Sequence, residues 1–518
     1  MKLKSILTGL CSTFIVSYFV LPFQTFAYYE YQEHLLGDFN SDLVVDFFDV
    51  GCYNDTVVEN DAELTINEYL DLTGDSQVDI FDELAARQIS IGQTEETKRC
   101  ECVDNGENYD LSEFDTPPIK EMRYCMPSQG DARLLGFYVD FPDCRYENEA
   151  SIDEIRHIAF GNEDENQINY PFESISAFFK RASKGALNLS GDFFRYTAKY
   201  NKSVYEKNSD LLIIECLESF ADKVDYTKFD ANCDKTFDAL LVSVPVEAGQ
   251  EHWWPRTGAF SDFDYTVSGM SIGYNIVGNA EIYDKEIWAP FVSTYAHELC
   301  HCMGLPDYYL MYSEDAEAFH GPAGCDLMEV DTASDLDCFS KYMLGWYRKD
   351  QITYYDDEGS YTLKNAQSDD GNCLIIHSNS FKNDPFGEYF IAEYCTLDGN
   401  NSLLGKLDSD YYPIDSGVRV FHIYADVYAY SNVSIFKYEN RSDFRRKSDK
   451  GVRLIRLVGD ADGGEMLKAE DDGFNMISDD TSGFAWYDRF GREIISTGLE
   501  IVAENCENGE FTLVIQEK

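Results

Sequence analysis

The segment from His297 to Asp307, HELCHCMGLPD, constrains this chain more than any other feature. If the segment is helical, His297 and His301 lie four residues apart on one face, so both imidazoles can bind the same metal ion. Glu298 lies beside them and can accept a proton from a water molecule. Gly304 permits the backbone conformation that ends a helix, and the chain can then return Asp307 to the ion as a third ligand. Three protein ligands and one open position are typical of catalytic zinc sites.

Residues downstream of this motif bear on the ligand set. The segment Gly324-Cys325-Asp326-Leu327-Met328 is similar to the methionine turn of metzincin peptidases, with Met328 as its structural residue. The third ligand has rivals, because peptidases of another zinc clan take a Glu from a later helix. Glu314 and Glu317 are available for that role, and His320 is a further rival. Asp307 has the spacing that returns it to the metal after the glycine, so we expect Asp307 to be the ligand.

The motif and its surroundings resemble a known family. HELCHCMGLPDYY resembles the zinc motif of the immune inhibitor A peptidases, and the His, His, Asp arrangement is also similar to that of snapalysin. Supporting segments extend the resemblance over residues 130 to 430; they are 135–143, 176–192, 340–346, 388–393 and 417–423. The resemblance implies a zinc endopeptidase in which His297, His301 and Asp307 bind the metal. Glu298 would then be the general base and acid. Because Tyr308 and Tyr309 directly follow Asp307, we also expect one of them to donate a hydrogen bond to the oxyanion.

A second pattern, near the N-terminus, is a pair of acidic loops with the ligand spacing of an EF-hand. Positions 1, 3, 5, 9 and 12 are Asp38, Asn40, Asp42, Asp46 and Asp49 and, 33 residues later, Asp71, Thr73, Asp75, Asp79 and Asp82. Ca²⁺ prefers several hard oxygen ligands at short range, and two loops in register exceed what an acidic composition produces by chance. The duplicated loop and helix resembles the dockerin module. That resemblance implies calcium-dependent binding to a cohesin module of a scaffoldin.

A third acidic loop precedes an apolar run at 239–244. Asp230, Asn232, Asp234 and Asp238 have the spacing of positions 1, 3, 5 and 9 of a calcium loop, and the family resemblance implies a loop of this kind here. No carboxylate occupies position 12, and Lys235 lies within the loop. A structural calcium site and a solvated acidic turn therefore both stay open.

Charge and the N-terminal residues indicate where the protein acts. Lys plus Arg number 41 and Asp plus Glu 95, so the formal net charge of −54 would repel nucleic acid and anionic membranes. Lys2 and Lys4 precede an apolar run at 6–23, and small residues end at Ala27, which is typical of a cleaved signal peptide. The run is also long enough for an uncleaved anchor. We expect cleavage and a secreted, extracellular protein attached to a cell-surface cellulosome.

Cysteine usage agrees with this location. Of 15 cysteines, Cys11 lies in the signal peptide, which leaves an even number compatible with disulfides. Cys300 and Cys302 lie inside the zinc motif, and Cys300 is three residues from His297. We expect both to be packed or disulfide-bonded rather than bound to metal.

The order of these patterns predicts a multidomain protein. It comprises a signal peptide at 1–27, a small all-α calcium-loop dockerin at 28–95, a linker at 96–120, an α/β metzincin-like peptidase domain at 121–350 and a β-rich C-terminal domain at 351–518. The function that follows is a secreted zinc endopeptidase on a cellulosome scaffold. Two alternatives stay open: a catalytically inactive dockerin-borne binding or inhibitory module, and a polysaccharide hydrolase with paired carboxylates.

Overall fold

The structure is a computed structural model in which the described residues belong to two compact units. The larger unit takes the described residues of 107–219, 239–261 and 274–518, and the smaller takes those of 220–238 and 262–273. The described residues are 111–122, 126–147, 150–262, 265–280, 282, 286–309, 321–324, 326–329, 334–378, 384–404, 416–430, 433–438, 440, 453–459, 466–469, 474–487 and 494–518. The predicted signal peptide, dockerin and first part of the linker lie outside them. Within the described residues the fold is mixed α/β and rich in sheet, as predicted.

The central sheet of the larger unit has five strands in the order β2-β1-β3-β7-β4. Four are parallel: β1 (Gly130–Asp140), β2 (Leu187–Thr197), β3 (Ala239–Ser243) and β7 (Tyr274–Gly278). The last, β4 (Arg256–Ala259), is antiparallel to β7 and forms an edge of the sheet. Most of β1 and all of β3 are buried, which agrees with the apolar runs at 134–139 and 239–242.

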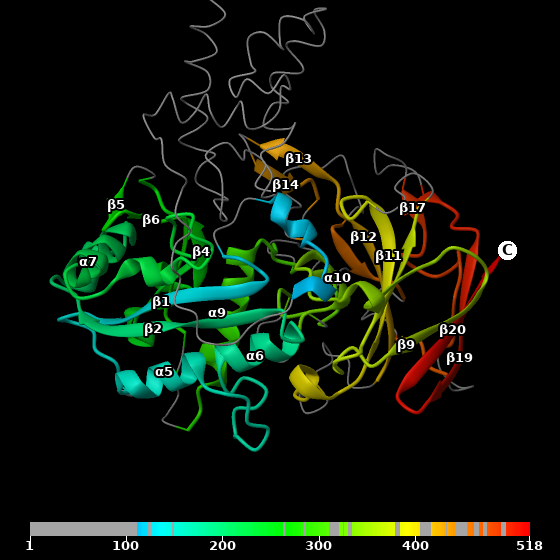
Figure 1. The fold of residues 1–518 in the computed structure, drawn as a ribbon, viewed down its shortest axis with the longest axis horizontal. Coiled ribbons are helices and arrows are strands. Elements are labelled where there is room, and N and C mark those ends of the chain that lie inside the picture. Colours follow the sequence, from blue (N-terminus) through cyan, green and yellow to red (C-terminus); the bar gives the residue numbers. More distant parts are fainter. Residues whose placement is uncertain are drawn as a thin grey trace, which may run out of the picture. The chain divides into compact units, whose positions relative to one another are not determined.

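Helices cover this sheet (Figure 1). Helix α5 (Ile152–Phe160) begins with a capping box, and α5 and α6 (Ile175–Ala182) pack against β2. Helix α9 (Ala289–Met303), which carries the zinc motif, packs against α6, β4 and β7. The remaining helices are α7 (Asp210–Phe220), α8 (Gln250–Trp253) and α10 (Cys338–Met343). The motif is therefore helical, as its spacing predicts.

The C-terminal part of the larger unit is built from two more sheets. One has the order β15-β12-β11-β10-β8, and its strands are β8 (Ile352–Tyr354), β10 (Cys373–His377), β11 (Glu388–Cys395), β12 (Gly417–Tyr424) and β15 (Ile455–Leu457). The other has the order β16-β19-β20-β9, with β9 (Gly359–Lys364), β16 (Met476–Ile477), β19 (Leu499–Glu507) and β20 (Glu510–Glu517). Two hairpins accompany them, β13 (Val427–Tyr430) with β14 (Val433–Phe436) and β17 (Trp486–Tyr487) with β18 (Ile494–Ile495). The predicted β-rich character of this part is confirmed.

The sheet that contains β11 is buried on both faces. Phe390 and Ala392 belong to the core shared with β19 and β20, whereas the alternate residues Tyr389 and Ile391 belong to the core shared with α9 and α10. Because side chains alternate between the two faces of a strand, one strand serves two cores. The sheet that contains β11 thus packs directly against the part that carries the predicted zinc motif, within one compact unit.

Residues predicted as the end of the linker are part of this packing. Short 3-10 helices span Leu111–Glu113 and Pro118–Glu121, and Phe114 and Ile119 are buried in the larger core. The folded unit therefore starts before residue 121. The division of the remaining chain into domains stays a prediction.

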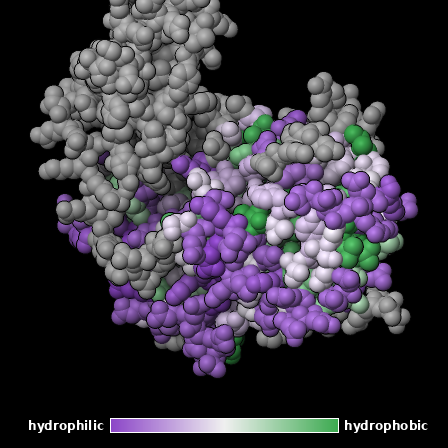
Figure 2. All heavy atoms as spheres, turned by 45° about the vertical axis from the view of Figure 1, so that its right-hand side comes forward, coloured by the Kyte–Doolittle hydropathy of each residue, from purple (hydrophilic) through white to green (hydrophobic). Residues whose placement is uncertain are grey.

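The visible surface of the described residues is mainly hydrophilic, with hydrophobic residues in small separate patches (Figure 2). This distribution agrees with the net charge of −54. None of the described helices combines the length and the apolar composition needed to cross a bilayer.

Candidate metal centre

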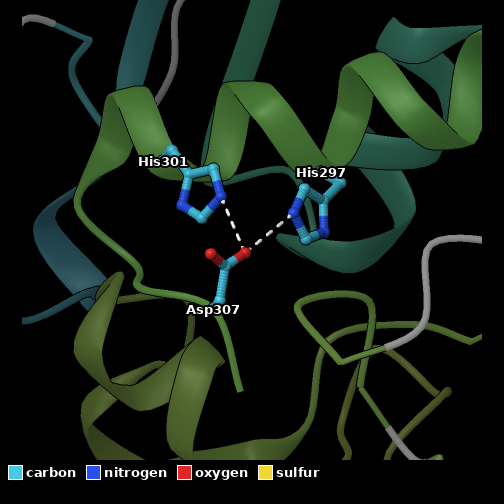
Figure 3. Close-up of side chains that lie close together, drawn as sticks. All are labelled: His297, His301 and Asp307. Carbon is cyan, nitrogen blue, oxygen red and sulfur yellow. Dashed lines mark ion pairs between the residues drawn. The ribbon is translucent and has the colours of Figure 1, made fainter. Parts of the chain in front are cut away.

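Three side chains converge at the end of α9 (Figure 3). His297 and His301 project from the same face of the helix toward Asp307, which lies four residues beyond its end. The Oδ1 atom of Asp307 is 3.3 Å from Nε2 of His297 and 3.1 Å from Nε2 of His301. Among the described residues, this is the group in which three potential ligand atoms of His, Cys, Asp or Glu lie within 4.8 Å of one another. The rival ligands Glu314, Glu317 and His320 lie outside the described residues.

The end of α9 explains how Asp307 reaches the histidines. Gly304 has a φ of 112° in the left-handed region, which glycine adopts without a steric penalty. Its N–H donates to the carbonyl of His301, and the N–H of Leu305 donates to the carbonyl of Cys300 at 3.0 Å. These bonds satisfy carbonyl groups at the helix terminus and turn the chain back. The glycine therefore acts as the sequence predicts.

Backbone carbonyls hold both imidazole rings. Nδ1 of His297 is 2.9 Å from the carbonyl oxygen of Leu327, and Nδ1 of His301 is 2.6 Å from that of Leu305. A carbonyl only accepts, so each Nδ1 must carry a proton, and in a neutral ring the lone pair then lies on Nε2. Both Nε2 atoms face the Asp307 carboxylate. Two lone pairs and a carboxylate at this distance need a positive charge between them, which a metal ion supplies.

Without a metal, a proton has to supply that charge. Burial alone would lower the pKa of His297, but the hydrogen bond with Asp307 and the charges of Glu298 and Asp307 raise this pKa to about 9. Burial acts to raise the pKa of Asp307, yet its two histidine partners hold this pKa well below its usual range. A carboxylate and imidazole nitrogens are ordinary zinc ligands, so the residues present fit the ion that the sequence predicts.

Glu298 lies beside the ligands and is itself buried. Its Oε2 accepts a hydrogen bond of 2.9 Å from the hydroxyl of Thr257, which belongs to β4. Of the three converging side chains, His301 is the most exposed, at 18% against 9% for His297 and 5% for Asp307. The site thus combines a buried carboxylate with three converging potential ligand atoms.

The predicted methionine turn is tied to these residues by its backbone. Met328 is fully buried, and its carbonyl accepts a bond of 3.0 Å from the N–H of Tyr308. The preceding carbonyl, that of Leu327, holds His297. Ala323 and Gly324 have positive φ values of 56° and 75°, which bend the chain before the turn. The Leu327 carbonyl of the turn therefore orients His297. The Met328 carbonyl holds the segment that directly follows Asp307.

Sequence reasoning missed the carboxylate that holds this turn. Asp326 is fully buried; its Oδ1 accepts from the N–H of Met328 at 2.6 Å, and its Oδ2 accepts from the N–H of Asp337 at 2.6 Å and the hydroxyl of Ser340 at 2.9 Å. Burial raises the pKa of Asp326 to about 6, although these hydrogen bonds act in the opposite direction. An acidic residue two positions before Met328, within an apolar stretch, was the available signal.

Tyr308 and the two cysteines of the motif are all buried. Tyr308 is fully buried, and its hydroxyl lies 3.0 Å from that of Ser340. This hydroxyl belongs to the core, so Tyr308 is wrong as a candidate for contact with an oxyanion. Cys300 and Cys302 are fully buried in the core, as expected for packed cysteines. Cys300 is a thiol, not half of a disulfide, and burial raises its pKa far above the usual value.

The third acidic loop belongs to the smaller unit, where the hairpin of β5 (Thr266–Val267) and β6 (Met270–Ser271) pairs with it at Thr236. Asp230, Asp234 and Asp238 are buried, and Asn232 is half-buried. Their carboxylates accept backbone N–H bonds from within the loop; the donors are Ala231, Asp234, Lys235 and Thr236. Burial raises the pKa of Asp230 to about 6, and burial with the charge of Asp230 raises that of Asp234 to about 8. A calcium ion in this loop stays a prediction.

Comparisons with known proteins add little to this geometry. No family model matches the sequence. No curated protein matches it either. Two crystal structures of wild-type OgpA from Akkermansia muciniphila match with 11% sequence identity over 53% of this chain and 73% of OgpA, at TM-scores of 0.23 and 0.22. Likeness at this level supports no conclusion, so the resemblances to the immune inhibitor A peptidases and to dockerins stay predictions.

Proposed function

We propose that this chain is a zinc-dependent endopeptidase. The observation that carries the proposal is the convergence of His297, His301 and Asp307, with each imidazole oriented by a backbone carbonyl and Glu298 next in sequence to the first ligand. Carbonyl partners of this kind fix the tautomer and the ring orientation of metal-binding histidines. A surface helix that carried the same residues by chance would not be expected to have a backbone carbonyl at each imidazole.

The mechanism follows from the roles of these side chains. His297, His301 and Asp307 would hold a zinc ion, which would supply a Lewis acid at a water molecule and a peptide carbonyl. Glu298 would take a proton from water as general base and deliver it to the leaving amine as general acid. Because Glu298 is buried, it exchanges protons with bulk water less freely than an exposed carboxylate does. A peptide in extended conformation can approach along the edge strand β4, whose Thr257 touches Glu298.

The test is removal and return of the metal. After dialysis of the purified full chain against a chelator, we expect hydrolysis of casein to be lost, and one equivalent of Zn²⁺ to restore it. Ca²⁺ alone is the control and should not restore it. Hydrolysis that persists in protein shown by metal analysis to hold no zinc would refute the proposal. A protein that binds one zinc and cleaves no protein substrate would instead favour an inactive binding module.

We also propose that residues 28–95 attach this peptidase to a scaffold. The support is the sequence pattern alone, because two loops in register place eight Asp, one Asn and one Thr at calcium-ligand positions. The same pattern, together with the signal peptide, supports secretion and a place in a cell-surface cellulosome. Each loop gathers carboxylates that repel one another, and Ca²⁺ relieves this repulsion.

We expect the full chain to bind a cohesin module in the presence of Ca²⁺ and to lose that binding in a chelator. Asp71→Ala should weaken the complex at least about 10-fold, because it removes a charged ligand at position 1 of the second loop. Glu59→Ala is the matched control, since Glu59 lies between the two loops at no ligand position. Surface plasmon resonance against cohesins from several scaffold-forming bacteria measures both effects. No binding to any of them, or equal binding by the two variants, would contradict the proposal.

A further inference from the structure

A single hydroxyl connects the edge of the central sheet to Glu298. Oγ1 of Thr257, on β4, is 2.9 Å from Oε2 of Glu298 and 2.8 Å from the backbone carbonyl oxygen of the same residue. The two residues are 41 positions apart in sequence, so the contact is purely tertiary. Thr257 is half-buried and pairs with Ile276 of β7. This pairing fixes the position of the Thr257 side chain relative to helix α9, which packs against β4.

We propose that Thr257 is a positioning residue that holds the Glu298 carboxylate in its working orientation. The proposal rests on the peptidase function and adds a residue to it. A carboxylate on a glutamate has three side-chain torsions, and a single hydrogen bond from a rigid element removes most of that freedom. Thr257 is suited to this, because a β-branched side chain on a strand has few rotamers.

The experiment compares Thr257→Val with Thr257→Ser. Valine keeps the branched shape and removes the hydroxyl, whereas serine keeps the hydroxyl. Loss of a hydrogen bond to a charged group should lower kcat of Thr257→Val roughly 10-fold or more. We expect KM, zinc content and the thermal unfolding midpoint to stay close to those of the unaltered protein. Thr257→Ser should recover most of kcat.

A double substitution separates positioning from a general effect on the strand. If Thr257 acts through Glu298, Thr257→Val should cost nothing further in a chain that already carries Glu298→Ala. Unchanged kcat in Thr257→Val, equal losses in the valine and serine variants, or additive losses with Glu298→Ala would each overturn the proposal. A zinc-loaded wild-type chain with no hydrolysis would refute the peptidase function itself, and this inference with it.

Discussion

Glu298→Ala should lower the rate of peptide hydrolysis by several orders of magnitude, on the order of 10²–10⁴-fold, and leave one zinc ion bound. Glu298 follows the proposed ligand His297 in sequence, and its Oε2 accepts a hydrogen bond from Thr257. If the proposed roles hold, its loss removes proton transfer and leaves the three proposed zinc ligands in place. Initial rates on a fluorogenic peptide, with metal analysis of the same sample, measure the two quantities together.

Glu251→Ala is the matched control, because Glu251 is an exposed glutamate on α8. This variant should hydrolyse the peptide at the wild-type rate. If Glu298→Ala kept near-normal activity, the proton-transfer role would be wrong. If the variant lost its zinc, the drop in activity would report on the metal site and not on the base.

Asp307→Ala should weaken zinc binding at least about 10-fold, since it removes the anionic member of the three converging side chains and leaves the two histidine nitrogens without it. In the structure, distance as well as sequence spacing supports Asp307 as the third ligand. Oδ1 of Asp307 lies within 3.3 Å of both histidine Nε2 atoms. Zinc content after dialysis against a weak competing chelator measures the loss. The zinc-induced rise in the unfolding midpoint should shrink in parallel.

Glu317→Ala serves as the comparison, because Glu317 is the rival ligand that another clan of zinc peptidases would use. It should retain zinc as the wild type does. The reverse order of losses would show that the third ligand comes from the later segment. Equal retention in both variants would mean that two histidines suffice, and the assignment of Asp307 would be abandoned.

Local sequence could predict the convergence of His297, His301 and Asp307, because the geometry of this segment is short-range. The spacing of His297 and His301 places both rings on one helix face whatever surrounds the helix. Gly304 ends that helix because it can adopt a positive φ, and only two residues separate it from Asp307. The strands of the C-terminal part could also be predicted, because alternating and apolar runs indicate strands whatever those strands pack against.

Side-chain identity alone misled where burial decides the role. Tyr308 follows a ligand directly, which favoured contact with a substrate, yet its hydroxyl lies in the core beside Ser340. In the C-terminal part, spacing indicated strands but could not reveal that alternate residues of β11 pack into two different cores. The burial of a side chain depends on which elements pack together. A periodic pattern in the sequence predicts an element but not the element it packs against.

By itself, the sequence determined the helical pair of histidines, the glycine that ends their helix, the adjacent glutamate and the candidate third ligand. Only the tertiary structure decided what holds two of these side chains: the Leu327 carbonyl on His297 and the Thr257 hydroxyl on Glu298. The reason is physical. The spacing of the histidines within one helix depends on a repeat of a few residues, whereas Leu327 and Thr257 lie 30 and 41 residues from their partners, and packing alone brings them into hydrogen-bond range.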